Sequence, residues 1–304
     1  MAPQPVLSNP FGTPAFGWHG LKVPAFEQAT ITVDDLERTF NVHVPADLDA
    51  KQPVPLVILL HGGGGTASDK LANMAKTADK HGFILVLPQG LEKHWNDGRQ
   101  VGGKHNYDDV NFISKLIDYL SGKYNIDRTR VYATGISNGG FFSAYLAAKL
   151  PDKIAAVAPV AATLTKEEYD TVTPPQPVSV LYIVGTDDPL VPFKGGEMHI
   201  GPIKRGFCSS AQDALAYWVK ADGCNATPLT SEMPLIAAAD RTSVTCEQFT
   251  GGKNGTEVVA YIIHGGGHTW PCGLRYLPRA IVGRVSHQLD ANETIWRFFS
   301  QHHL

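Results

Sequence analysis

The hydrophobic residues of the chain occur in short continuous runs that alternate with stretches of helical periodicity. A short continuous apolar run is typical of a strand covered on both faces of a sheet. Residues 29–33 and 38–44 instead alternate between apolar and polar positions around a turn, which predicts two antiparallel strands. The expected central strands cover residues 54–60, 83–87, 131–134, 154–160, 178–184 and 257–263.

Helical periodicity fills the segments between these strands. We expect a helix capped by Ser68, a second capped by Asp108, and a third that Pro151 ends. Two further helices are expected over residues 211–220 and 290–300. The alternation of strand and helix predicts an α/β protein with one doubly wound, mostly parallel sheet and helices on both faces.

The chain shows no internal repeat and no linker. Residues 1–26 are rich in Pro, Gly and aromatic residues without a period, so we expect an irregular N-terminal arm there. We expect residues 27–304 to form a single domain. A chain of 304 residues that is 43% hydrophobic and 18% charged can bury a sizeable core.

Charge and hydropathy exclude two classes of protein. The 26 basic and 29 acidic residues nearly cancel, and no run of Lys or Arg stands out, so a nucleic-acid partner is not expected. The longest apolar runs are too short to cross a bilayer, so no membrane-spanning helix is expected. The first residues lack the basic start and apolar core of a secretion signal, which leaves a cytosolic protein or one whose signal has been trimmed.

The four cysteines lie in the last third of the chain, which is compatible with two disulfides in an oxidising compartment. Of the three possible pairings, we favour Cys224 with Cys246 and Cys208 with Cys272, because a loop-like insert separates the first two. Free buried thiols are the alternative. Disulfides would favour a secreted or periplasmic protein with a trimmed signal peptide.

A Gly-x-Ser-x-Gly motif joins an expected strand to an expected helix. Residues 131–134 run into Gly135, Ser137 and Gly139, and a helical pattern follows. In this context the serine lies on a strained turn that exposes its hydroxyl above the sheet, and glycines on either side avoid collisions of Cβ atoms. The amide of Asn138 opens the helix and can hold an anion that forms on a substrate. We interpret Ser137 as a nucleophile.

A serine hydroxyl needs a base to take its proton and an acid to orient that base. Asp188 and His268 each follow an expected strand, so they would lie at the same sheet edge as Ser137. Asp187 is the alternative acid and His264 the alternative base. A metal site of His264, His268 and Cys272 is disfavoured, because the glycines between the histidines oppose a helix, and no metal is expected.

Two loops at the same edge are candidates for binding. Residues 62–65 are four glycines after a strand, and their exposed amides can hold an oxyanion, for which we choose Gly63. A plain flexible loop is the alternative. Trp95 lies in a polar and aromatic loop at the edge where open α/β sheets bind ligands. Trp95 is expected either to form a pocket wall or to anchor its loop.

These motifs together resemble the polyhydroxybutyrate depolymerase and feruloyl esterase group of α/β-hydrolases. The likeness runs from about residue 30 to the C-terminus and rests on residues 60–65, 95–97, 135–140, 185–192 and 265–271. It implies the α/β-hydrolase fold and a secreted serine esterase with Ser137, Asp188 and His268 as catalytic triad and the amides of Gly63 and Asn138 as oxyanion hole. Many depolymerases of this group have Cys in place of Gly63, but only the backbone amide is required there.

The resemblance implies a serine carboxylic ester hydrolase that acts through an acyl-enzyme without a cofactor. We expect feruloyl, acetyl or similar small soluble esters of plant polysaccharide as substrates. Poly- or oligo-(3-hydroxybutyrate) is the alternative substrate, and a serine peptidase or a binding protein that has lost catalysis is more remote. Trp95, Trp270 and His61 are expected to contact the small-molecule or oligomeric substrate.

Overall fold

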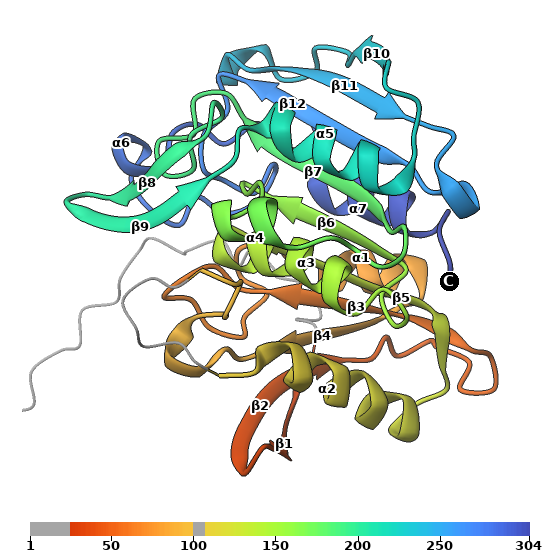
Figure 1. Ribbon diagram of the computed structural model, residues 1–304. Helices are drawn as coiled ribbons and strands as arrows, with labels where there is room; N and C mark the ends of the chain where they lie inside the picture. The colour runs from red at the N-terminus through yellow and green to blue at the C-terminus, as the bar shows by residue number, and fades with distance from the viewer. Residues whose placement is uncertain (1–24, 100–106) are drawn as a thin grey trace, which may run out of the picture.

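The computed structural model describes residues 25–99 and 107–304, and ten of the strands in this part form one sheet (Figure 1). Almost all of the predicted N-terminal arm therefore lies outside the described residues. Six central strands pair in parallel, in the order β4, β3, β5, β6, β7, β12. Their bounds are β3 (Val54–Leu60), β4 (Ile84–Pro88), β5 (Ile126–Ile136), β6 (Ala156–Val160), β7 (Ser179–Gly185) and β12 (Val258–His264). These are the strands that the continuous apolar runs predicted.

Antiparallel strands extend the sheet on both sides. Beyond β4 lie β2 and β1, and beyond β12 lie β11 and β10. The outer strands are β1 (Glu27–Val33), β2 (Leu36–His43), β10 (Leu229–Glu232) and β11 (Ser243–Phe249). The predicted mixed sheet of an α/β protein is confirmed, and β10 and β11 are additions that the apolar pattern did not indicate.

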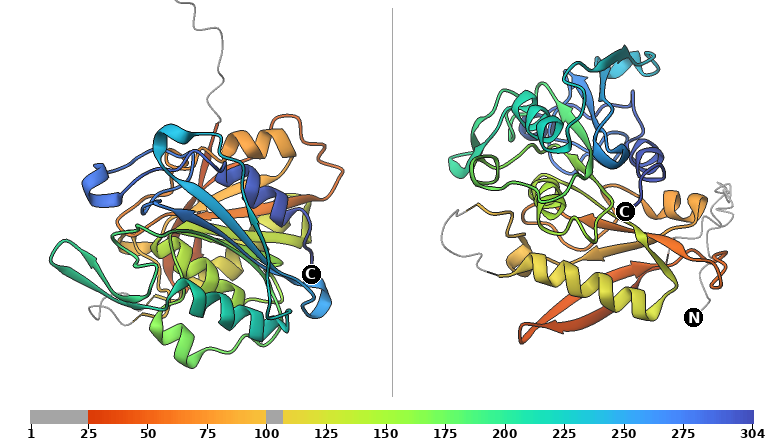
Figure 2. Two further views of the ribbon diagram at one scale, coloured as in Figure 1. Left: turned by 90° about the horizontal axis from the view of Figure 1, so that it is seen from above. Right: turned by 45° about the vertical axis from the view of Figure 1, so that its right-hand side comes forward.

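Helices cover both faces of the sheet (Figure 2). Side chains of β3 alternate between two hydrophobic layers, so Leu56 packs in one layer and Val57 in the other. The first layer includes helices α2 (Asp109–Lys123), α3 (Asn138–Lys149) and α5 (Ala211–Asp222). The second includes α1 (Ala75–His81) and α7 (Ala291–Phe299). The chain thus buries each strand between two sets of helices, as continuous apolar runs require.

Helix α1 begins later than the sequence predicted, and Ser68 does not cap it. The carboxylate of Asp69 accepts hydrogen bonds from the amides of Met74 and Ala75, at 2.6 and 2.9 Å. These bonds hold the chain in an irregular turn up to Met74. Asp108 does cap α2, since its side chain accepts from the amide of Asn111.

A separate two-stranded hairpin projects beside the main sheet. It consists of β8 (Gly196–Ile200) and β9 (Ile203–Cys208), and the short helix α4 (Lys166–Thr171) lies near it. A further short helix, α6 (Arg279–Val282), lies at the same side of the molecule (Figure 1). The sequence pattern predicts none of these elements, because they are short and lack a sustained period.

The predicted disulfides are not formed in the structure, where all four cysteines are free thiols. Cys224 packs against the hydrophobic layer that holds α5, whereas Cys246 packs against the layer on the opposite face of the sheet. Cys208 is buried beside Phe141, and Cys272 is exposed. The predicted bond between Cys224 and Cys246 was wrong because these cysteines, although close in sequence, lie on opposite faces of the sheet.

Candidate active site

Ser137 lies at the sharp turn between β5 and α3. Its backbone has φ 58° and ψ −124°, a conformation that L-residues rarely adopt and that costs on the order of 1–3 kcal/mol. A Cβ atom on Gly135 would lie 2.6 Å from the carbonyl oxygen of Leu60, and one on Gly139 would lie 2.4 Å from the same oxygen. The two glycines therefore allow the turn to pack against β3, and this packing holds Ser137 in its strained conformation.

His268 and Asp188 form a buried pair beside this turn. The imidazole Nδ1 of His268 lies 2.7 Å from Oδ2 of Asp188, and the two residues are 1% and 8% exposed. The other carboxylate oxygen of Asp188 accepts from the amides of Leu190 and Val191, each at 2.8 Å. The carboxylate is thus fixed from both sides, and it holds the proton of His268 on Nδ1. The Nε2 atom is left as a proton acceptor.

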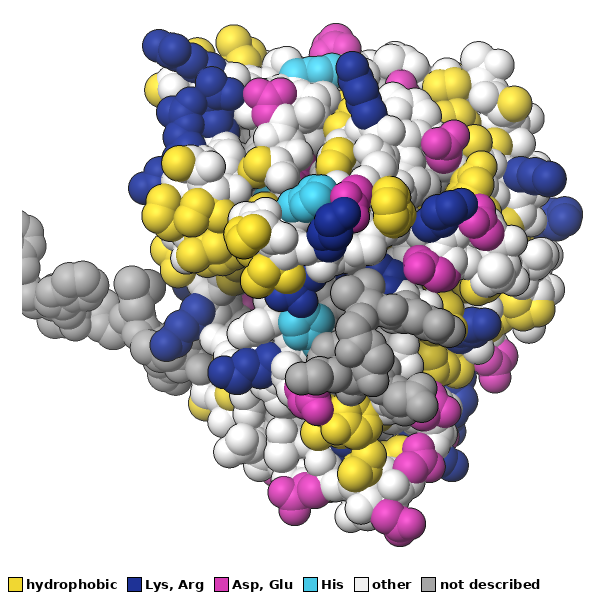
Figure 3. All heavy atoms as spheres, turned by 60° about the vertical axis from the view of Figure 1, so that its left-hand side comes forward, with side chains coloured by type: hydrophobic (Ala, Val, Ile, Leu, Met, Phe, Trp, Pro, Cys, Tyr) yellow, Lys and Arg dark blue, Asp and Glu magenta, His cyan; other side chains and the backbone are white. Residues whose placement is uncertain are grey.

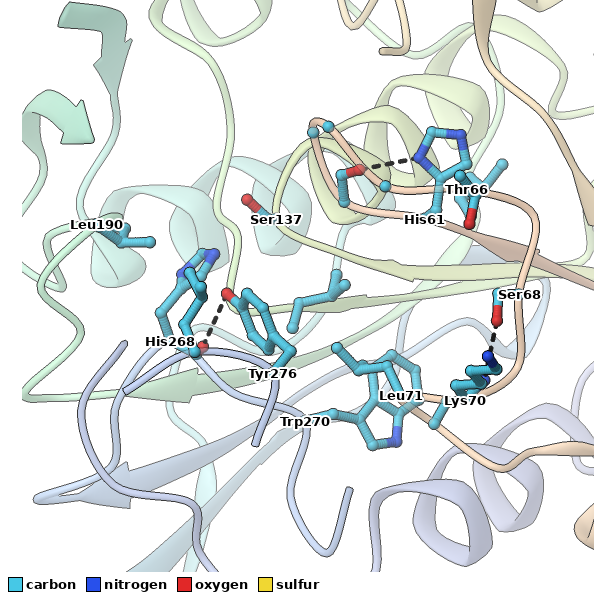
Figure 4. A pocket seen from close by; sticks show the side chains of 18 of the residues that line it. His61, Thr66, Ser68, Lys70, Leu71, Ser137, Leu190, His268, Trp270 and Tyr276 are labelled. Atoms are coloured by element: carbon cyan, nitrogen blue, oxygen red, sulfur yellow. Dashed lines mark hydrogen bonds between the residues drawn. The ribbon is translucent and has the colours of Figure 1, made fainter. Parts of the chain in front are cut away.

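Ser137 and His268 line one pocket, which Figure 4 shows from close by. Both residues face the same hollow, although they come from the ends of different strands, β5 and β12. The pocket has a volume of about 390 Å³, within the range of small-ligand sites. The structure therefore brings the serine, the histidine and the aspartate together at the carboxyl edge of the sheet.

The alternative acid and base lie elsewhere. The side chain of Asp187 is 57% exposed, and its nearest cation is Arg284 at 3.5 Å. The ring of His264, at the end of β12, lies 2.7 Å from the hydroxyl of Thr245 on β11. Neither residue lines the pocket of Ser137.

The glycine loop after β3 forms the pocket wall next to Ser137. A Cβ on Gly62 would lie 3.6 Å from the Cβ of Ser137, so the two backbones are in close approach. The amide of Gly64 donates to the carbonyl of Lys93 and that of Gly65 donates to the carbonyl of Gly62, at 2.8 and 2.9 Å. These bonds fix the loop, and the intervening residue Gly63 lines the pocket with Ser137.

His61 supports this loop as a neutral imidazole. Its Nε2 accepts from the amide of Gly90 at 3.0 Å, and its Nδ1 lies 2.8 Å from the carbonyl of Gly62, to which it donates. Burial lowers the pKa of His61 to about 4, despite the hydrogen bond to Gly62. His61 lines the pocket, and its hydrogen bonds also make it part of the loop's support, so its role as a substrate contact stays a prediction.

Trp95 anchors its loop and does not form a wall of the Ser137 pocket. It is 2% exposed, its indole Nε1 donates to the carbonyl of His61 at 3.0 Å, and its ring stacks on Phe142. Its backbone amide and carbonyl both bond to the side chain of Asn138. Of the two readings left open by the sequence, the structure supports the packed anchor, because every polar group of this tryptophan is used internally.

The side chain of Asn138 also reaches a buried ion pair that the sequence analysis did not single out. Its amide nitrogen donates to Asp97 at 2.7 Å, and Asp97 pairs with Arg99 through a short contact. This network connects the start of α3 to the loop after β4. Because buried polar groups hold the Asn138 side chain, they also fix the backbone amide of this residue, which follows the nucleophile directly.

The rest of the pocket is mainly apolar, and apart from Trp270 the sequence pattern singled out none of the apolar side chains in this part of it. Trp270 lines it as predicted, with its indole nitrogen turned away to donate to Asn292. A polar end is provided by Thr66, Ser68 and Lys70 of the loop before α1 (Figure 4). The apolar residues added by the structure are Leu71, Leu190, Ile200, Tyr276, Leu277 and Ile281. In the sequence, a stretch dense in apolar residues around 274–282 marks the last three of these, and Leu190 lies in the motif of residues 185–192.

A family model described as "Putative esterase" matches residues 34–227, which is more than half of the chain. A relative named "Putative esterase NocK", from Nocardia uniformis subsp. tsuyamanensis, is 31% identical over 87% of this chain and 79% of its own length. "Feruloyl esterase B" of Piromyces equi is 31% identical over 76% of this chain, which spans only 42% of that relative. "Poly(3-hydroxyalkanoate) depolymerase C" of Paucimonas lemoignei is 31% identical over 39% of this chain and 30% of its own length.

Solved structures show the same fold at low identity. A "Thermostable Esterase" aligns over 92% of this chain and 63% of its own, with a TM-score of 0.56 and 16% identity. The acetyl xylan esterase from Aspergillus awamori aligns over 80% of this chain and 94% of its own, with a TM-score of 0.54 and 16% identity. No helix among residues 25–99 and 107–304 is long and apolar enough to cross a membrane. The chain belongs to the esterase family and is a carboxylic ester hydrolase with the α/β-hydrolase fold.

Proposed function

We propose that Ser137, His268 and Asp188 carry out ester hydrolysis through an acyl-enzyme. The observation that carries this proposal is the buried pair of His268 and Asp188, whose imidazole shares one apolar pocket with Ser137 on its strained turn. Asp188 keeps the proton of His268 on Nδ1, so Nε2 acts as the base that takes the serine proton. The serine oxygen then attacks the ester carbonyl.

The tetrahedral intermediate needs donors for its oxyanion. We assign this role to the backbone amides of Gly63 and Asn138, which belong to the glycine loop and to the first residue of α3. His61 and the Asp97 network hold these two segments in place. Collapse of the intermediate expels the alcohol, which takes the proton from His268, and water then cleaves the acyl-enzyme through the same base.

We assign small soluble esters of plant polysaccharide, feruloyl or acetyl, as the preferred substrates. A mostly apolar pocket of about 390 Å³ with Trp270 and Tyr276 in its wall suits an aromatic acyl group. The names of the relatives include feruloyl and acetylxylan esterases. Hydroxyalkanoate oligomers are the second candidate, favoured by the same apolar wall and by the relative named as a depolymerase.

We place the enzyme outside the cytosol, in the medium or the periplasm, where an esterase meets polysaccharide esters. Its substrate is a small or oligomeric ester, and the chemistry assigned to the triad needs no metal or cofactor.

The substrate assignment is tested with initial rates on methyl ferulate, acetylated xylan, p-nitrophenyl esters of increasing chain length and hydroxybutyrate oligomers. We expect methyl ferulate or acetylated xylan to give the highest kcat/KM. Higher kcat/KM on the hydroxybutyrate oligomers would replace this assignment with the second candidate. A peptide panel run alongside separates an esterase from a serine peptidase.

A further inference from the structure

A second cleft, rich in arginine, lies next to the esterase pocket. It has a volume of about 690 Å³ and is lined in part by Arg241, Arg275, Arg279 and Arg284. Figure 3 shows Lys and Arg side chains gathered beside a group of hydrophobic side chains on this face of the molecule. The whole chain has a formal charge of −3, so the positive charge of this cleft is opposite in sign to the net charge of the protein.

The arginines of this cleft are largely unneutralised. Within the part of the chain that the structure describes, the side chains of Arg241, Arg275 and Arg279 form no ion pair, and all three residues are exposed. Arg284 lies 3.5 Å from Asp187, a weak contact. Four unpaired or weakly paired guanidinium groups repel one another, and an anionic ligand would remove this repulsion.

The one carboxylate in the described lining of the cleft does not balance these charges. Asp240 accepts hydrogen bonds from the amide and hydroxyl of Thr242, the amide of His287 and the side chain of Gln288. Its oxygens are therefore occupied in shaping the loop. The four arginines and one aspartate of the lining give a formal charge of +3, and Asp187, which lies outside the lining near Arg284, offsets only part of it.

One segment separates the cleft from the esterase pocket. Along residues 274–284, Tyr276, Leu277 and Ile281 face the pocket of Ser137, while Arg275 and Arg279 face the cleft. The same segment holds the loop of the proposed base. The carbonyl of Val282 accepts from the amide of His268 at 2.6 Å, and the carbonyl of Arg284 accepts from the amide of Gly267 at 3.0 Å.

We propose that this cleft binds the carboxylates of a uronic-acid-bearing polysaccharide whose acyl ester enters the neighbouring pocket. The inference rests on the proposed function and defines its substrate class further. Guanidinium groups bind carboxylates with paired hydrogen bonds, and four arginines spread over two segments, Arg241 in one and the other three along residues 274–284, suit an extended anion better than a single ion. A ligand that reaches both sites must carry an ester and carboxylates on one chain, which acylated acidic polysaccharides do.

The test compares two forms of one substrate. Acetylated glucuronoxylan oligosaccharides are hydrolysed before and after an α-glucuronidase removes the uronic acid, by wild type and by the double variant Arg275→Gln/Arg279→Gln. We expect wild type to prefer the charged form by roughly 10-fold in kcat/KM, mainly through KM, at low ionic strength. The double variant loses most of this preference, and salt near 1 M abolishes it in wild type, because screening then acts over about 3 Å.

Arg297→Gln is the matched control, since Arg297 is an exposed arginine on α7 outside the cleft. It should retain the preference of wild type. Equal kcat/KM on both substrate forms in wild type, or an intact preference in the double variant, would overturn the inference.

A binding measurement separates this inference from the esterase proposal. Calorimetry follows the uronic-acid oligosaccharide and inorganic phosphate as they bind to Ser137→Ala protein. If the oligosaccharide binds tightly and this binding requires Arg275 and Arg279, the proposed carboxylate site is supported even if no ester is turned over. Phosphate that binds as tightly as the oligosaccharide would replace the polysaccharide assignment with a general anion site. If wild type hydrolyses neutral esters rapidly but the Ser137→Ala protein does not bind the oligosaccharide, the esterase proposal stands and the proposed carboxylate site is rejected.

Discussion

The two sides of the esterase pocket are built in different ways. On the side of the proposed chemistry, His268 and Asp188 are 1% and 8% exposed, and they follow strands of the central sheet. On the side of the entrance, Ile200, Leu277 and Ile281 are each at least 40% exposed and belong to the β8–β9 hairpin and to the segment around α6. One side is polar, buried and fixed by hydrogen bonds, and the other is apolar and exposed.

This difference predicts how each side responds to change. Buried polar groups act at low effective dielectric and depend on one another, so loss of one partner has a large, non-additive effect. Exposed apolar side chains contribute by contact area alone, in proportion to the area that a substrate covers. The chemistry side should therefore set the rate, and the entrance side should set the choice of acyl group.

The largest effect is expected from Ser137→Ala, which removes the nucleophile. The value of kcat on p-nitrophenyl acetate should fall by roughly 10⁶-fold, because the base and oxyanion donors cannot replace the missing oxygen. Initial rates measure the loss, and an unchanged far-ultraviolet circular dichroism spectrum shows that the fold is retained. A near-normal rate would refute the assignment of Ser137.

Asp188→Asn should lower kcat by roughly 10⁴-fold, because the amide favours the wrong tautomer of His268. The matched control is Asp187→Asn, one residue away, whose side chain is 57% exposed and does not contact His268. We expect the control to retain nearly the full rate. A similar loss of kcat in both variants would contradict the assignment of Asp188, and not Asp187, as the acid that orients His268.

His61 gives a prediction for pH. Its pKa of about 4 in the fold is lower than the ordinary 6.5, so the unfolded chain binds the proton more readily between these values. The stabilisation by neutral His61 is complete above pH 6.5 and is lost as the pH falls towards 4, by about 3 kcal/mol in free energy of unfolding.

Urea unfolding at pH 7, 5.5 and 4.5 measures this dependence in wild type and in His61→Gln. The variant should be less stable at pH 7 but should lose less stability on acidification, since glutamine does not titrate. Other groups contribute equally to both proteins, so the difference between the two slopes isolates His61. Parallel slopes would contradict the proposed link between the neutral imidazole and the glycine loop.

The smallest effect is expected at the entrance. Leu277→Ala should raise KM for methyl ferulate by roughly 10-fold while kcat on p-nitrophenyl acetate changes little, because only the larger acyl group reaches this side chain. Leu235→Ala is the control, since Leu235 is 64% exposed and does not line the pocket. An equal loss on both substrates would show that the entrance acts on the chemistry itself.

The difference between the two sides also separates what the sequence could predict from what it could not. The strand and helix that flank Ser137 are signalled by residues within a few positions of it, and the glycines at 135 and 139 relieve collisions that are local to the turn. Asp188 and His268 could be placed at the same edge because parallel strands end together. Each of these inferences uses short-range geometry or a regular sheet.

Packing between distant segments decided the remaining features. Trp95 became an anchor because His61 and Asn138, which are far from it in sequence, satisfy its polar groups. The expected pair Cys224 and Cys246 failed because the two thiols lie on opposite faces of the sheet.

The sequence by itself determined the order of the central strands and of the longer helices between them, the strained serine turn and the set of acid and base candidates. These depend on backbone conformation and on hydrophobic period, which neighbouring residues specify. Only the tertiary structure decided that the segment 274–284 has one apolar face towards the esterase pocket and one cationic face towards the arginine cleft. Such a segment has no regular period, so the direction of each side chain is set by the loops against which it packs.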